Sequence, residues 1–105
     1  MEKSNYSGFF RLSVEERLNE VAEFANLTED EQKTLSMADS LDMDKADHMI
    51  ENVIGKYALP IGVALNFVIN GKDVIIPMVC EEASVVAACS NAAKMARPAG
   101  GFTAS

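Results

Sequence analysis

Apolar residues in the first part of the chain recur every three or four positions, which is the spacing of one face of an α-helix. Residues 13–16 (SVEE) fit a capping box and predict a first helix that ends near Asn26. Residues 28–31 (TEDE) repeat the box and predict a shorter second helix through about Ala38. Two amphipathic helices are therefore expected near the start of the chain.

A third amphipathic helix is predicted from Asp42 or Asp44, either of which can cap its first turn. Gly55 supplies a residue at which this helix can end. The apolar residues expected to form its buried stripe are Ala46, Met49, Ile50 and Val53. All three predicted helices precede any segment with the pattern of a strand.

Beyond Pro60 the apolar period changes from that of a helix to strict alternation, which is typical of a β-strand. Asn70-Gly71 interrupts the alternation and is a strong signal for a two-residue hairpin turn. With this turn, we expect Phe67 to lie opposite Val74. The same register pairs Leu65 with Ile76 and Val63 with Met78. It would place all these large apolar side chains on one face of the hairpin.

A final helix is predicted from about Ala83 to Arg97, directly before Pro98. Its alanines lie on several sides and would let other backbones come close, so we expect a buried helix. These alanines are Ala83, Ala87, Ala88, Ala92, Ala93 and Ala96. The predicted fold class is α+β: three N-terminal amphipathic helices, a β-hairpin with an Asn-Gly turn and an alanine-rich buried helix, as part of a larger domain.

Composition narrows the class of protein. At 105 residues, the chain has room for one domain or part of one. The net charge is −7, and residues 1–51 hold thirteen acids against five bases, which argues against a nucleic-acid or membrane-surface partner. No apolar run approaches the roughly 18 residues of a membrane span, and the first ten residues lack a secretory signal pattern. We therefore expect a cytoplasmic protein.

The sequence predicts no metal site. Cys80 and Cys89 are too far apart for a C-x-x-C pair and are expected to be free thiols, with a single disulfide between them as the alternative. His48 is the only histidine, and no further metal ligand or nucleophile accompanies it on its predicted helix. We expect His48 to be a surface residue.

Glu81 and Glu82 lie between the second strand and the final helix, and two explanations fit them. Acids near a helix N-terminus stabilise its dipole by about 0.3–1 kcal/mol each, so both could be capping residues. Alternatively, one carboxyl is partly desolvated among apolar neighbours, which favours its protonated form and suits it to donate a proton. Those neighbours would be Val79, Cys80, Val85 and Val86. The pattern alone leaves both explanations open.

Several motifs in the second half of the chain occur in a characteristic order. They are ENVIG (51–55), LPIGVA (59–64), NGKDVIIPMV (70–79), EEASVVAA (81–88) and GGFT (100–103). In this order and spacing they resemble the N-terminal part of hydroxymethylglutaryl-CoA reductase, in its soluble bacterial and archaeal form. Residues 10–13 (FRLS) are similar to the F-R-x-L-S opening of that form, with one residue fewer.

The resemblance implies roles for particular residues. Glu82 matches the family's catalytic glutamate, and Ser84 matches a serine that contacts the hydroxymethylglutaryl part of the substrate. Arg11 resembles an arginine that meets the CoA phosphates, although a solvated charge ahead of the first helix is an equal alternative. The segment that matches the family's dimer interface consists of Glu51, Asn52, Val53, Ile54 and Gly55.

The resemblance also implies a reaction, the interconversion of hydroxymethylglutaryl-CoA with mevalonate and CoA, using NADH or NADPH and no metal. The family's catalytic lysine, aspartate and later histidine, and its dinucleotide motif, have no match in these 105 residues. Residues 1–105 are therefore expected to be the N-terminal segment of the large domain, which binds substrate and CoA and forms a homo-oligomer. Alone, this segment is expected to be inactive. The alternative is a non-catalytic, self-associating interaction module.

Overall fold

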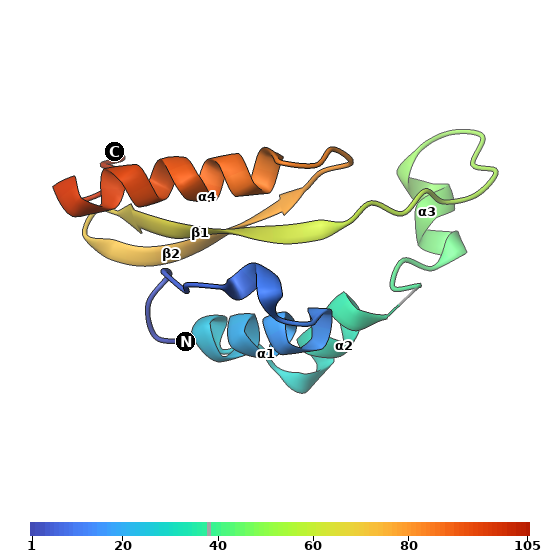
Figure 1. Ribbon diagram of the computed structural model, residues 1–105. Coiled ribbons are helices and arrows are strands. Elements are labelled where there is room, and N and C mark those ends of the chain that lie inside the picture. The colour runs from blue at the N-terminus through green and yellow to red at the C-terminus, as the bar shows by residue number, and fades with distance from the viewer. Residues whose placement is uncertain (38) are drawn as a thin grey trace.

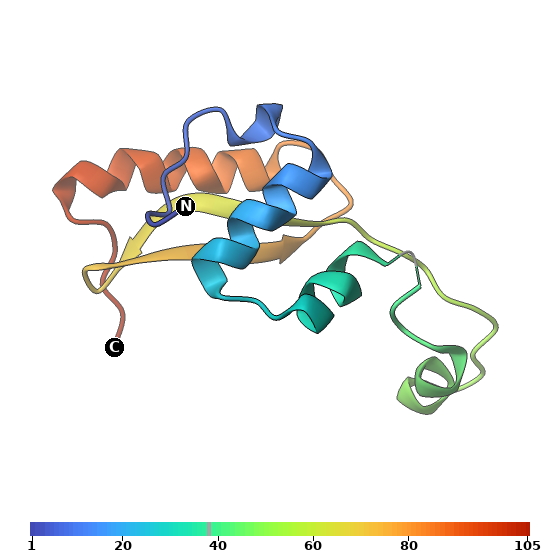
Figure 2. The same cartoon turned by 90° about the horizontal axis from the view of Figure 1, so that it is seen from below.

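The computed structural model describes residues 1–37 and 39–105 and has an α+β fold, which confirms the predicted class (Figure 1). In chain order its elements are η1 (Phe9–Arg11), α1 (Val14–Ala25), α2 (Glu29–Ser36), α3 (Met43–Met49), β1 (Ile61–Ile69), β2 (Lys72–Val79), α4 (Val85–Ala96) and η2 (Arg97–Ala99). Helix α4 lies along one side of the β1–β2 hairpin, and α1 and α2 lie on the other. Helix α3 and the segment that follows it stand apart from the hairpin in both views (Figures 1 and 2).

The first two helices begin as their capping boxes predict. The Ser13 side chain accepts a hydrogen bond from the backbone of Glu16 at 3.1 Å, and the Glu16 carboxylate accepts from the backbone of Ser13 at 2.8 Å. Thr28 and Glu31 form the same pair of bonds at the start of α2. Helix α2 ends at Ser36, and the predicted last residue, Ala38, lies outside the described residues.

Helix α3 begins as expected but is shorter than its apolar stripe predicted. The Asp42 side chain caps it by accepting from the backbone of Lys45 at 2.8 Å. The helix ends at Met49, since Ile50 is extended (φ −141°) and Asn52 is left-handed (φ 56°). β-branched residues have reduced helix propensity, and asparagine tolerates the left-handed region, so this stretch leaves the helix before Gly55. Of the predicted stripe, only Ala46 is buried.

The hairpin has the predicted turn, but most of the predicted register is wrong. Phe67 does lie opposite Val74. Beyond this pair, β1 contains one extra residue, a β-bulge between Ala64 and Phe67, with Asn66 in the left-handed region (φ 71°). The observed partners are Ala64 with Ile76, Val63 with Pro77 and Gly62 with Met78. Val63 therefore lies on the opposite face from Ile76 and Met78, and the six apolar side chains do not share one face.

Helix α4 packs closely on β1. Gly62 lies beneath Val86, whose methyl group would be 3.6 Å from a Cβ placed on the glycine. Ala64 of β1 and Ala93 of α4 are almost completely buried. The other face of the helix, which carries Ala87, Ala88 and Ala92, is exposed. Within these residues the helix is buried on one side only, whereas its small residues predicted burial on several sides.

The chain is more extended than a compact domain of its size. Its radius of gyration is 16.1 Å, against about 13 Å for a compact domain of this length. It exposes 8102 Å² of surface, whereas a compact monomer of this mass exposes about 5,700 Å². Ile54 and Tyr57, in the segment that follows α3, are among the most exposed apolar side chains. None of the helices described in residues 1–37 and 39–105 is long and apolar enough to cross a membrane.

Candidate functional site

The candidate catalytic carboxyl lies in the short connection between β2 and α4. Cys80 extends the hairpin by one bond, because its backbone N–H donates to Pro60 O at 3.3 Å. Its sulfur lies 3.4 Å from the backbone nitrogen of Glu82 and 3.5 Å from its carbonyl oxygen, and so holds the turn closed. Glu82 itself is exposed. The described residues alone therefore do not desolvate this carboxyl, and its burial in the complete protein stays a prediction.

The connection also departs from the helix-capping explanation. Helix α4 starts at Val85, so Glu81 and Glu82 both precede its first turn, which contains no acid. Ser84 occupies the N-cap position, but its side chain makes no capping hydrogen bond and its backbone is left-handed (φ 76°). This conformation costs a non-glycine residue about 1–2 kcal/mol. Observed backbone strain of this kind is concentrated at functional sites, so it favours a binding role for the Ser84 loop.

Arg11 lies in η1, a short segment with one buried side and one exposed side. Phe9 is buried, and its ring meets that of Tyr6 edge to face at 5.6 Å. Phe10 and Arg11 point outward, with the Arg11 guanidinium carbon 5.3 Å from the centre of the Phe10 ring. Arg11 is exposed, which is compatible both with a phosphate contact and with a solvated charge.

A surface hollow lies beside this segment, where it meets the end of α4. Its lining residues are Asn5, Tyr6, Ser7, Gly8, Phe10, Asn66, Lys94, Arg97 and Pro98. Neither this hollow nor the second one, on α3, includes Glu82, Ser84 or Arg11. These 105 residues thus place the predicted site residues on a shared scaffold without bringing them into one cleft.

The sequence did not predict a polar cluster that joins the N-terminal segment, the hairpin and the end of α4. Ser4 is completely buried, and its hydroxyl lies 2.8 Å from Phe67 O and 2.9 Å from an Asp73 carboxylate oxygen. Arg97 donates to the Ser4 hydroxyl at 2.9 Å and to the same Asp73 oxygen at 2.7 Å. We call Ser4, Asp73 and Arg97 the clamp. Asp73, an acid in a strand of mostly apolar residues, could have indicated this cluster, because a carboxylate in such a strand needs a buried partner.

The clamp predicts a pH-dependent contribution to stability. The Arg97 guanidinium, followed by the Ser4 backbone N–H, holds the pKa of Asp73 below its ordinary value of 3.8. The unfolded chain therefore binds this proton more readily, so the contribution is complete above the ordinary value and is lost as the pH falls through the lower folded one. In the full-length protein, we expect the difference in melting temperature between wild type and Asp73→Asn to shrink as the pH falls below about 4.

The exposed acid Asp47 provides a control for that measurement. Asp47→Asn should leave the melting temperature near that of wild type at every pH. If the difference for Asp73→Asn stayed constant down to pH values at which the protein unfolds, Asp73 would not carry this linkage.

The predicted interface segment, residues 51–55, is largely exposed. Ile54 has a relative exposure of 102%, and only Val53 is partly covered. The segment is tied back to the start of α3 by Lys56, which forms an ion pair with Asp39 and donates to Leu41 O at 2.7 Å. This part of the chain therefore presents the apolar side chain of Ile54 on a loop that is bonded to the residues before α3.

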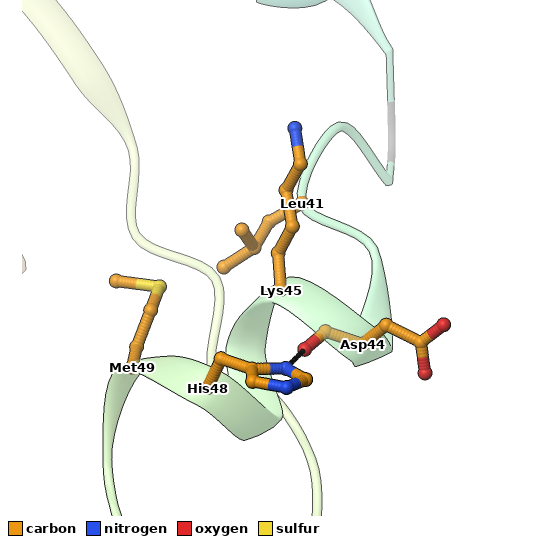
Figure 3. A pocket seen from close by; sticks show the side chains of 5 residues that line it. All are labelled: Leu41, Asp44, Lys45, His48 and Met49. Atoms are coloured by element: carbon orange, nitrogen blue, oxygen red, sulfur yellow. Dashed lines mark hydrogen bonds between the residues drawn. The ribbon is translucent and has the colours of Figure 1, made fainter.

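His48 is exposed on α3, as expected. Its Nδ1 lies 2.6 Å from Asp44 O, one turn earlier, and Figure 3 shows it beside Lys45 and Met49 at the edge of the second hollow. Across residues 1–37 and 39–105, no group of three or more histidine, cysteine or acidic side chains is arranged to hold a metal ion.

Comparison with known proteins gives a consistent result. Residues 13–105 match the family described as hydroxymethylglutaryl-coenzyme A reductase. The 3-hydroxy-3-methylglutaryl-coenzyme A reductase of Archaeoglobus fulgidus is 60% identical over 100 residues, which cover 95% of this chain and 23% of that protein. A probable reductase of the same name from Borreliella burgdorferi is 52% identical over 48 residues, or 46% of this chain and 11% of its own length.

Solved structures agree. The class II 3-hydroxy-3-methylglutaryl-CoA reductase of Streptococcus pneumoniae, determined bound to NADPH in open conformations, superposes with a TM-score of 0.84 at 37% identity, covering 94% of this chain and 27% of that one. This chain therefore spans about a quarter or less of the relatives it matches. From the family match over residues 13–105, the shared fold and the motif order, this chain belongs to the hydroxymethylglutaryl-coenzyme A reductase family.

Proposed function

We propose that this chain is the N-terminal, large-domain segment of an enzyme that interconverts hydroxymethylglutaryl-CoA with mevalonate and CoA, and that Glu82 is its catalytic acid. The observation that supports the proposal is the connection between β2 and α4, in which the exposed Glu82 precedes the strained Ser84 by two residues. We propose that the rest of the enzyme covers this turn and makes the dry cleft that 105 residues do not form.

The chemistry explains why an acid is needed there. Reduction of a thioester to an alcohol adds hydride twice to the same carbon, and the oxygen takes up a proton at each stage. Two molecules of NADH or NADPH, bound one after the other in the rest of the enzyme, would supply the two hydrides. After the first addition and protonation the thiohemiacetal breaks its C–S bond and gives an aldehyde and the CoA thiol; the second addition gives the alcohol. We propose that Glu82 donates the proton to the thiohemiacetal and aldehyde oxygens.

Substrate recognition is proposed for two further residues. The Ser84 hydroxyl makes no capping bond, so it is available to the hydroxymethylglutaryl group. The exposed Arg11 guanidinium is available to the CoA phosphates, with which it can form charge-assisted hydrogen bonds. The chain contains no glycine-rich dinucleotide loop, so we propose that the nicotinamide site lies in the rest of the enzyme. A cytoplasmic location is proposed from the resemblance to the soluble form.

The direct test is an assay of the full-length protein. Oxidation of NADPH or NADH that depends on hydroxymethylglutaryl-CoA and yields mevalonate would support the proposal. A correctly folded protein that oxidises neither cofactor with this thioester would contradict it.

We also propose that the enzyme is a homo-oligomer that uses residues 51–55 at its interface. The exposed apolar surface around Ile54 supports this, because soluble proteins seldom leave large apolar patches uncovered. In the full-length protein, Ile54→Glu should shift the oligomer towards monomer in sedimentation experiments, because it would bury an unpaired charge.

The control for this experiment is Val14→Glu, which adds the same charge at an exposed apolar residue on the first turn of α1. It should leave the oligomer intact. If the Ile54→Glu variant formed oligomers as readily as wild type, the interface would lie elsewhere. The same exposed surface favours the alternative function, a non-catalytic self-associating module, which would assemble normally but show no reductase activity.

A further inference from the structure

The clamp attaches the first residues of the chain to the hairpin and to the end of α4. Besides the bonds made by its hydroxyl, Ser4 donates its backbone N–H to Asp73 at 2.8 Å and accepts from the backbone of Asn66 at 2.9 Å. Arg97 also donates to Asn66 O at 3.2 Å. Every polar group of Ser4 is therefore bonded to the hairpin or to Arg97. A hydrogen-bond network that is centred on a buried serine and closed by a partly buried ion pair favours one arrangement of its members.

The segment between the clamp and Arg11 is short and has little freedom. The rings of Tyr6 and Phe9 pack edge to face, and Phe9 is buried. The backbone turns at Gly8 (φ 79°) into η1, where Arg11 N donates to Gly8 O at 2.9 Å. On the far side of Arg11, the capping box at Ser13 begins α1. Arg11 is thus held between two anchors, the clamp and the start of α1.

We propose that Ser4, Asp73 and Arg97 are positioning residues that hold the N-terminal segment so that the Arg11 guanidinium meets the phosphates of CoA. This inference rests on the proposed function, since it takes CoA as the ligand of Arg11. The clamp touches no reacting atom. It acts on affinity for the nucleotide end of the substrate and not on proton transfer at Glu82, which lies beyond the opposite end of α4.

The test uses Ser4→Ala in the full-length enzyme, which removes one hydroxyl and no charge. We expect the KM for hydroxymethylglutaryl-CoA, and the Kd of CoA measured by calorimetry, to rise about tenfold, the effect of losing one or two well-placed charge-assisted bonds. Turnover at saturation should stay within about twofold of wild type. The KM for the hydroxymethylglutaryl thioester of pantetheine, which lacks the nucleotide phosphates, should not change.

A double-mutant cycle separates positioning from a merely structural role. In an Arg11→Ala background, Ser4→Ala should have no further effect on CoA affinity, because the group it positions is gone. Arg97→Lys keeps the charge but loses the forked guanidinium that bonds both Ser4 and Asp73. It should cause the same loss of CoA affinity, and so provides the test if Ser4→Ala does not fold. Thr28→Ala, which removes the cap of α2 and lowers stability without touching the clamp, should leave both KM values unchanged.

Three results would overturn the proposal: unchanged CoA affinity in Ser4→Ala and Arg97→Lys, an equal rise in KM for both thioesters, or additive effects of Ser4→Ala and Arg11→Ala. Failure of the proposed function looks different. If the wild-type protein bound CoA but reduced no thioester, the calorimetric cycle alone would still decide whether the clamp positions Arg11.

Discussion

Replacing Glu82 with glutamine in the full-length enzyme is expected to lower kcat by about 10²–10⁴-fold, the usual effect of losing a general acid. Glutamine has nearly the same shape and can still hydrogen-bond the substrate oxygen, but it has no carboxylic proton to transfer. Because the substitution leaves Arg11 and the clamp untouched, the Kd of CoA should stay near that of wild type. Steady-state kinetics and calorimetry on the same preparation would measure both quantities.

Glu81 offers a matched control for this experiment. It is the same residue type, it is exposed, and it lies in the same connection between β2 and α4. Glu81→Gln makes the same change in charge and should affect kcat far less. Equal losses of kcat in the two variants would mean that turnover depends on the total negative charge of the connection and not on proton donation by Glu82. Undiminished turnover in Glu82→Gln would remove Glu82 from the chemistry.

The second large effect is expected on stability, from Gly101→Ala. Gly101 has a positive φ of 78°, and a Cβ placed on it would lie 2.2 Å from Val68 O and 2.9 Å from Val68 C. The contact is with backbone of β1, which cannot move aside without breaking the hairpin. We expect a loss of about 3 kcal/mol or more, as for other residues forced into a filled space with a strained backbone. Thermal unfolding and soluble yield would report it.

Gly100→Ala separates the two causes of that loss. Gly100 also has a positive φ, 99°, but a Cβ there would have no neighbour within 4 Å. Its replacement should cost only the backbone term, about 1–2 kcal/mol. If the two variants were equally stable, the approach of Gly101 to Val68 would not constrain the fold as the structure indicates.

The parts of this fold that depend on neighbours in sequence could be predicted. Both capping boxes use side chains three residues apart, and the Asn-Gly turn needs only the left-handed tendencies of its own two residues. Phe67 opposite Val74 follows directly from that turn. In each case the determining interaction is local, so the residue types alone were sufficient.

The rest of the register could not be predicted, because the bulge at Asn66 is held by distant residues. The Asn66 side chain donates to Ser90 O at 2.9 Å, and Leu65 N donates to the Ser90 hydroxyl at the same distance. On its other side, the Asn66 backbone is bonded to Ser4 and Arg97. The alternation of apolar residues does not show that β1 must contain an extra residue to bond with these partners.

The candidate site shows the same division. The motif order indicated Glu82 and Ser84, and the structure places both in the connection between β2 and α4, where the backbone of Ser84 is strained. Whether the Glu82 carboxyl is exposed or desolvated could not be predicted, because the groups that would cover it lie elsewhere and leave no trace in the residues around it. The clamp was missed for a related reason: Ser4, Asp73 and Arg97 are far apart in the chain, and only the folded hairpin brings them together.

The clamp also implies an order in which parts of the chain can fold during synthesis on the ribosome. Ser4 and Arg97 are 93 positions apart. At about 5–20 residues per second, about 5–20 seconds pass between the synthesis of one and the other. The hairpin and the first two helices, whose bonds are local, can form during that interval. Ser4 can bond to the hairpin once the hairpin has formed, but the clamp is complete only when Arg97, at the end of the final helix, has been synthesised.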